Sequence, residues 1–162
     1  MRLSSAYWVD PRQIRFKISP HDDLSGLVGG NWDIERRWRL TDAVKHRSIA
    51  ERYVNGLKWE DTELFRDIYA RRIVNEPIRG EATLEGLLEQ YYTRVDSMFE
   101  HLKHKGFKDS PQKPILLIGR SGEIFIGNQG NHRLAMAQVL GLTKFAGRVI
   151  CRHKLSSLNE AA

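Results

Sequence analysis

The residues best suited to chemistry are His132 and Arg133, which follow a glycine-rich corner and open an expected helix. The segment Gly127-Asn128-Gln129-Gly130 turns the backbone, and the helix should end at Leu140-Gly141. The first turn of a helix carries unpaired N–H groups and a partial positive charge. Glycines let an anion approach the backbone, and His and Arg side chains add donors. The pattern predicts a phosphate-binding cradle at residues 127–133; the alternative is a solvated turn before an ordinary helix.

Four segments are expected to form the sheet that positions this cradle. Ile115 to Ile118 is a continuous apolar run, typical of a buried strand, and Glu123 to Ile126 is the return arm of a hairpin. Gln13 to Ile18 alternates polar and apolar residues, which indicates a half-buried strand. Phe145 to Arg152 reads as the last strand. We expect an α/β (α+β) fold with a small mixed sheet and a parallel crossover.

About three helices are expected between the first strand and the hairpin, as an insertion at about residues 40–106. The first follows Thr41 as N-cap, the second begins near Trp59, and the longest runs from a Thr83 N-cap to a stop at Gly106. We expect a single domain over residues 1–155 and a tail over 156–162. The insertion could cover the cradle as a lid and bring Asp33 or Glu35 near a bound phosphate.

Asp33 ends a glycine-rich loop, Gly29-Gly30-Asn31-Trp32-Asp33, and is a candidate metal ligand or general base. The alternative is an Asx turn in which Trp32 plugs the core. Next to it, Arg36-Arg37-Trp38-Arg39 could stack bases and contact phosphates. We favour a surface turn with Trp38 in the core, because the segment is too short to follow a nucleic-acid strand.

Composition narrows the class of protein. The 162 residues are 41% hydrophobic and 28% charged, which is ordinary for a globular domain. A single cysteine, Cys151, excludes an intrachain disulfide. No apolar run approaches the roughly 20 residues that span a bilayer, so we expect no membrane partner and a cytoplasmic protein. His101 and His104 lack a third ligand, so we expect no protein-held metal.

Charge is unevenly distributed along the chain. The net charge is +6, and residues 111–162 hold seven basic and two acidic side chains, a net +5. This excess lies in the same third as the cradle, where it suits a compact anionic ligand such as a nucleotide; the alternative is a solvated basic surface.

The segment GNQGNHRLAMAQVLGL resembles the signature of the ParB/sulfiredoxin superfamily, in which a Gly-x-His-Arg or Gly-Glu-Arg-Arg turn enters a helix. The resemblance extends from Ile115 to His153. It implies that the turn binds nucleotide phosphates; the candidate phosphate-binding residues are Asn128, Gly130, Asn131, His132 and Arg133.

Two departures narrow the resemblance. Sulfiredoxins carry their catalytic cysteine where this chain has Asn131, so sulfiredoxin chemistry is not expected. Partition ParB proteins have Glu at the position of His132, and a helix-turn-helix module follows their motif. Only 29 residues follow Arg133, so we do not expect a complete partition protein.

Three functions remain open. The first is a nucleotide-dependent phosphotransferase, similar to the free-serine kinases of this superfamily. There His132 and Arg133 would stabilise the transferring phosphate of ATP, ADP or CTP, Asp33 or Glu35 would act as base, and Mg²⁺ would bridge the phosphates. The second is a nucleic-acid-binding protein or nuclease, and the third a non-catalytic nucleotide-responsive interaction protein. The oligomeric state stays open.

Overall fold

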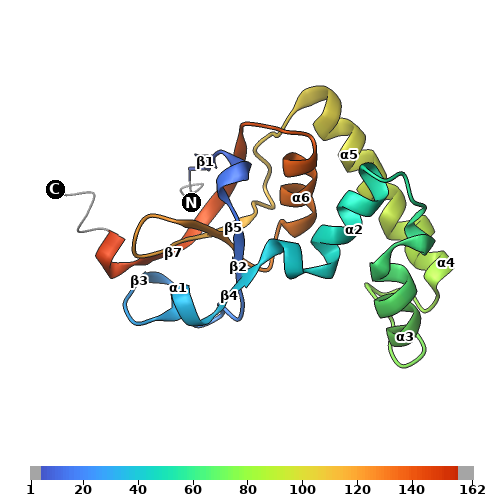
Figure 1. Ribbon diagram of the computed structural model, residues 1–162, viewed down its shortest axis with the longest axis horizontal. Coiled ribbons are helices and arrows are strands. Elements are labelled where there is room, and N and C mark those ends of the chain that lie inside the picture. The colour runs from blue at the N-terminus through green and yellow to red at the C-terminus, as the bar shows by residue number, and fades with distance from the viewer. Residues whose placement is uncertain (1–4, 157–162) are drawn as a thin grey trace.

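The computed structural model describes residues 5–156 and has a mixed α/β fold, as expected (Figure 1). Seven strands form the sheet in the described part of the chain. They are β1 (Tyr7–Val9), β2 (Phe16–Ile18), β3 (Gly26–Val28), β4 (Arg37–Arg39), β5 (Ile115–Ile118), β6 (Ile124–Ile126) and β7 (Phe145–His153).

The four predicted strands are adjacent at the centre of the sheet, in the order β7-β5-β6-β2. Strands β5 and β6 form the expected antiparallel hairpin, and β7 runs parallel to β5. The crossover from β6 through the following helix to β7 therefore places β7 beside β5 and not beside β6. Three short strands were not predicted. Strand β1 pairs with the start of β7, β3 pairs with the end of β7, and β4 pairs with β2 at the edge of the sheet.

The helices between β4 and β5 form the expected insertion. Its principal elements are α2 (Val44–Tyr53), α3 (Ala70–Arg72), α4 (Leu84–Leu87) and α5 (Thr93–Lys105), with π-helical segments at Leu64–Tyr69 and Leu88–Tyr92. The Thr83 side chain accepts a hydrogen bond from the Gly86 N–H at 3.0 Å, which confirms this N-cap. The Thr41 N-cap is wrong: Leu40–Asp42 is a 3₁₀ turn, and Ala43 is the residue that precedes α2.

Helix α6 (Asn131–Val139) lies between the sheet and the inserted helices (Figure 1). Its residues contribute to two hydrophobic cores. Leu134 and Ala137 pack on the sheet with Ile126 and Phe145. Ala135 and Met136, on the next positions around the helix, pack on the insertion core, which is rich in aromatic rings. Burial on both sides fixes the helix against the sheet and the insertion, and so fixes the position of its first turn.

Asp96 on α5 holds the insertion together. Its carboxylate accepts hydrogen bonds from the Tyr53 hydroxyl at 2.7 Å, the Trp59 indole at 3.0 Å and the Arg52 guanidinium at 2.9 Å. These contacts connect α2, the Trp59 turn and α5.

No helix in residues 5–156 is both long enough and apolar enough to cross a membrane. The expected tail lies mostly outside the described residues. Its first residue, Ser156, is buried, and its hydroxyl donates to the His153 carbonyl at 2.8 Å.

Candidate functional site: a cationic cavity at the start of helix α6

The glycine corner before α6 is held in a shape that only glycine can adopt at Gly130. This residue has φ +95°, and a Cβ atom there would lie 2.5 Å from Cβ of Pro114. The Asn131 side-chain amide donates to the Gly127 carbonyl at 3.0 Å, and the Asn128 N–H donates to His21 Nε2 at 2.9 Å. The bend is therefore fixed by one hydrogen bond within it and by one hydrogen bond to His21.

The first turn of α6 presents free backbone donors. Helical bonding starts with the Leu134 N–H, which donates to the Gly130 carbonyl at 2.9 Å, and no side chain caps the helix. Among the described residues, the N–H groups of Asn131, His132 and Arg133 have no acceptor. Unpaired amides at the positive end of a helix dipole favour an anion.

His132 supplies a second, independent feature at this turn. Its Nε2 atom is buried and has no hydrogen-bond partner in the described part of the chain, while Nδ1 lies 3.4 Å from the Tyr91 hydroxyl. Burial, and then the positive charges of Lys45 and Arg79, lower the pKa of His132 to about 3. At neutral pH the ring is uncharged, so His132 can offer the hydrogen bond expected of it but adds no positive charge. A buried polar atom without a partner is costly, and a ligand that paired with it would remove that cost.

Arg133 keeps its charge without a carboxylate partner. Its Nη1 donates to the Ser110 hydroxyl at 3.1 Å, and no ion pair of the described residues includes it. Burial lowers the pKa of Arg133 from its usual value. Arginine nevertheless stays protonated in proteins, so the guanidinium is charged. A desolvated guanidinium with spare donors is suited to phosphate oxygens.

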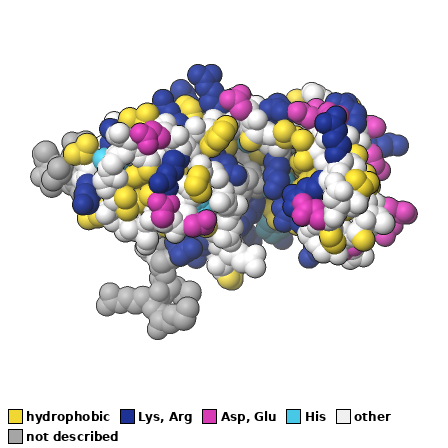
Figure 2. Space-filling model, turned by 90° about the horizontal axis from the view of Figure 1, so that it is seen from below, with side chains coloured by type: hydrophobic (Ala, Val, Ile, Leu, Met, Phe, Trp, Pro, Cys, Tyr) yellow, Lys and Arg dark blue, Asp and Glu magenta, His cyan; other side chains and the backbone are white. Residues whose placement is uncertain are grey.

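The cradle opens into a cavity of about 880 Å³ between the sheet and the helical insertion. Figure 2 shows the surface hollowed between these two parts, with Lys and Arg side chains in and beside the hollow. The six basic side chains that line the cavity come from separate parts of the chain: Lys17, Lys45, Arg79, Arg94, Lys108 and Arg133.

The cavity wall is almost free of negative charge. Its one carboxylate, Asp109, pairs with Lys113 at 3.0 Å, and within residues 5–156 none of the six cations forms an ion pair. Burial lowers the pKa of Lys17, and burial together with Arg79 and Lys17 lowers that of Lys45. Crowded, unneutralised cations of this kind favour a multivalent anion.

Arg79 lines the cavity, and its backbone adopts a left-handed conformation. It is the one non-glycine residue with positive φ, +51°, in the described chain, and its guanidinium lies 3.9 Å from the centre of the Tyr91 ring. The contact is a cation–π interaction that orients the charge beside His132. Non-glycine residues in this conformation are strained and are found disproportionately at functional sites.

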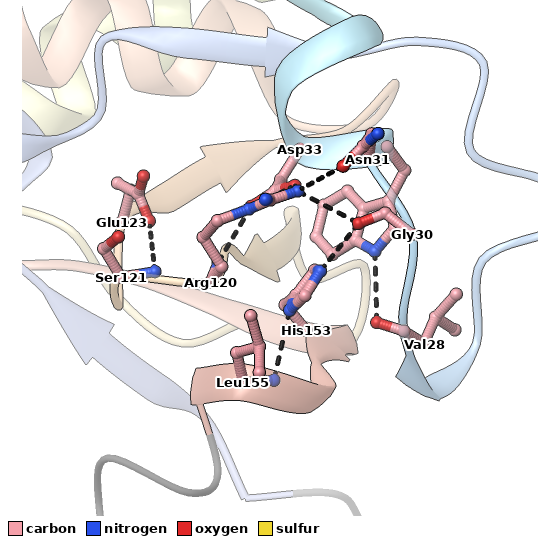
Figure 3. Close-up of polar contacts among 10 residues, drawn as sticks. Val28, Gly30, Asn31, Asp33, Arg120, Ser121, Glu123, His153 and Leu155 are labelled. Carbon is pink, nitrogen blue, oxygen red and sulfur yellow. Dashed lines mark hydrogen bonds and ion pairs between the residues drawn. The ribbon is translucent and has the colours of Figure 1, made fainter.

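The structure places Asp33 and Glu35 elsewhere. Asp33 is 2% exposed and forms a two-pronged ion pair with Arg120, whose Nη2 and Nε lie 2.7 Å and 3.0 Å from its oxygens (Figure 3). Burial alone would raise the pKa of Asp33, but the hydrogen bonds from Arg120 outweigh it and hold the pKa below its usual value. Glu35 is exposed on α1 (Trp32–Glu35).

The surroundings of Asp33 are structural. His153 Nε2 donates to the Gly30 carbonyl at 2.9 Å, and its Nδ1 accepts from the Leu155 N–H at 3.1 Å (Figure 3). Trp32 is buried against Phe125, as the alternative interpretation of this loop expected. These contacts tie the loop before α1 to the end of β7 and to the β5–β6 turn.

Asp33 cannot serve a phosphate in the cradle. Its partner Arg120 lies two residues after the end of β5, whereas the cradle follows β6 and adjoins the first residue of β5. Because β5 and β6 are antiparallel, the two sites lie at opposite ends of the hairpin, separated by at least the length of β5, about 10 Å for its four residues. Neither Asp33 nor Glu35 lines the cavity, so the role of catalytic base assigned to them is not supported by their positions.

The cavity offers no ligand set for a metal ion. In residues 5–156 no group of three or more His, Cys, Asp or Glu side chains is arranged to hold one. The Mg²⁺ expected from the resemblance would have to be held by the phosphates of its nucleotide.

The sequence pattern identified the backbone of the cradle but missed most of its charge. Five of the six cavity cations precede residue 110, and neither local composition nor spacing relates them to His132. Arg79 is followed by Gly80, and both residues have positive φ in the structure. This glycine was the one local sequence feature that could have drawn attention to Arg79. No protein-family model matches the chain, and no curated protein or solved structure matches it significantly.

Proposed function

We propose that this protein binds a nucleotide through its phosphates in the cationic cavity, as the ParB/sulfiredoxin resemblance implies. The observation that carries the proposal is the unpartnered, buried Nε2 of His132 beside three free amides and Arg133. The phosphates accept from these groups, and the surrounding cations neutralise them. A cavity of about 880 Å³ is within the usual size range for a small-molecule site.

Binding is better supported than phosphoryl transfer. Transfer to a hydroxyl needs a base that accepts its proton, and the one carboxylate in the cavity wall, Asp109, is paired with Lys113. Two-metal phosphodiester cleavage needs clustered carboxylates, and the described residues contain no such cluster. Of the three functions considered, these observations favour the non-catalytic, nucleotide-responsive interaction protein.

The test is a thermal-shift and calorimetric titration with ATP, ADP and CTP, each with and without Mg²⁺. The wild-type protein gains about 2.7 kcal/mol of stability when the ligand is at 100 times its Kd. Arg133→Ala removes a charge-assisted hydrogen bond of about 1.5–3 kcal/mol, so its Kd rises by about one to two orders of magnitude.

Arg71→Ala is the matched control, because Arg71 is exposed on α3 and does not line the cavity. Its Kd should equal that of the wild type. No binding by the wild type, or equal affinities in Arg133→Ala and Arg71→Ala, contradicts the proposal.

A further inference from the structure

Trp38 is a large aromatic side chain held in place on the surface. It is 63% exposed, so the interpretation that placed it in the core is wrong. It lies on β4, at the edge of the sheet, and its indole N–H donates to the Ser19 carbonyl at 3.4 Å. The hydrogen bond runs to the neighbouring strand and orients the ring, while the face of the ring stays available.

The sheet register places Trp38 beside the cationic cavity. Trp38 is paired directly with Lys17 of β2, and directly paired residues of antiparallel strands point to the same face. Phe16 and Ile18 point to the other face, where they join the core around Trp32. Lys17 lines the cavity, and neighbouring strands lie about 4.8 Å apart. Trp38 therefore lies one strand away from Lys17, the cavity cation that the sheet contributes.

The chain itself joins the two features. Strand β4 leads through the Leu40–Asp42 turn into α2 (Figure 1). The second residue of α2, Lys45, also lines the cavity. Trp38 is thus paired with Lys17 in the sheet and lies seven residues before Lys45 in the chain, and both of these cations line the cavity.

We propose that Trp38 is the stacking platform for a nucleobase whose phosphates lie in the cavity. The inference rests on the proposed function and adds what recognises the rest of the ligand. A phosphate next to Lys17 leaves the attached sugar and base to extend over β2 toward the indole. Stacking on an aromatic ring accepts every base, so the platform serves a free nucleotide or the end of a single-stranded nucleic acid.

The test compares a ligand that has a base with one that lacks it. ATP and inorganic tripolyphosphate are titrated into the wild type, Trp38→Ala and Trp38→Phe. Trp38→Ala weakens ATP binding by about 5- to 150-fold, the range for loss of one stacked base, and leaves the Kd for tripolyphosphate unchanged. Trp38→Phe keeps most of the ATP affinity. Leu27→Ala, at a residue 57% exposed on β3, is the control and changes neither Kd.

The other results have distinct meanings. If Trp38→Ala weakens both ligands equally, or neither, while Arg133→Ala weakens both, stacking on Trp38 is refuted and the phosphate site stands. If the wild type binds neither ligand and no single-stranded oligonucleotide, the stacking proposal and the proposed function both fail. A titration with oligothymidylate distinguishes a free nucleotide from a nucleic-acid strand as the ligand. If the wild type binds oligothymidylate more tightly than ATP, and Trp38→Ala loses this binding, the ligand is a nucleic-acid strand.

Discussion

The buried imidazole of His132 should make the protein sensitive to acid. In the unfolded chain its pKa is near the ordinary value of 6.5, whereas in the folded protein burial and the charges of Lys45 and Arg79 lower it to about 3. Between these values the unfolded state binds a proton that the folded state does not, so stability falls as pH falls. One proton contributes about 1.4 kcal/mol per pH unit, which gives about 2 kcal/mol between pH 6.5 and pH 5.

The assay is urea denaturation, followed by circular dichroism, at pH 8 and pH 5 for the wild type and His132→Gln. At pH 8 both side chains are neutral, so the difference in free energy of unfolding measures packing and hydrogen bonding without a contribution from charge. On going to pH 5 the wild type loses about 2 kcal/mol more than the variant, because glutamine does not titrate. His46, whose pKa burial also lowers, is present in both proteins and cancels.

Equal losses in the two proteins would refute this account of His132. The ligand gives a further check, because a bound anion next to the ring favours its charged form. Saturating tripolyphosphate should therefore reduce the extra acid sensitivity of the wild type.

Two further substitutions distinguish the role of the cradle from that of the Asp33–Arg120 ion pair. Gly130→Ala forces a side chain into φ +95° and against Pro114, so we expect a loss of about 2 kcal/mol or more, measured as a lower urea midpoint; an unchanged midpoint would contradict the geometry of the corner. Asp33→Asn breaks the ion pair with Arg120 and should cost about 2–3 kcal/mol, below the fully buried range because Arg120 is partly exposed. Its Kd for tripolyphosphate should be unchanged, and a loss of binding with stability intact would restore Asp33 to the site.

The predicted part of the fold is the part with strong local patterns. The apolar runs of β5 and β6, the mainly buried segment of β7 and the alternation that contains β2 identify the central strands, because most residues of these strands are buried or half-buried. Strand β4 has the sequence Arg-Trp-Arg with all three residues exposed, so no burial pattern marks it. It forms because its backbone pairs with β2, a tertiary interaction that local propensity does not report.

The candidate site was predicted to the same limited extent. Gly130, His132 and Arg133 are neighbours in sequence, and the physics of a helix N-terminus acts within one turn. Lys17, Lys45 and Arg79 reach the same place only because β2, α2 and the turn before α4 fold around α6. Asp33 was misjudged because its partner, Arg120, lies 87 residues away in the chain.

The most direct measurement is an amide NMR titration of the labelled protein with tripolyphosphate. The account predicts the largest shifts at the N–H groups of Asn131, His132 and Arg133, together with the His132 ring, because these donors receive the anion. If the ligand binds while those four signals stay unchanged, and the shifts fall on other parts of the surface, the helix start is not the binding site.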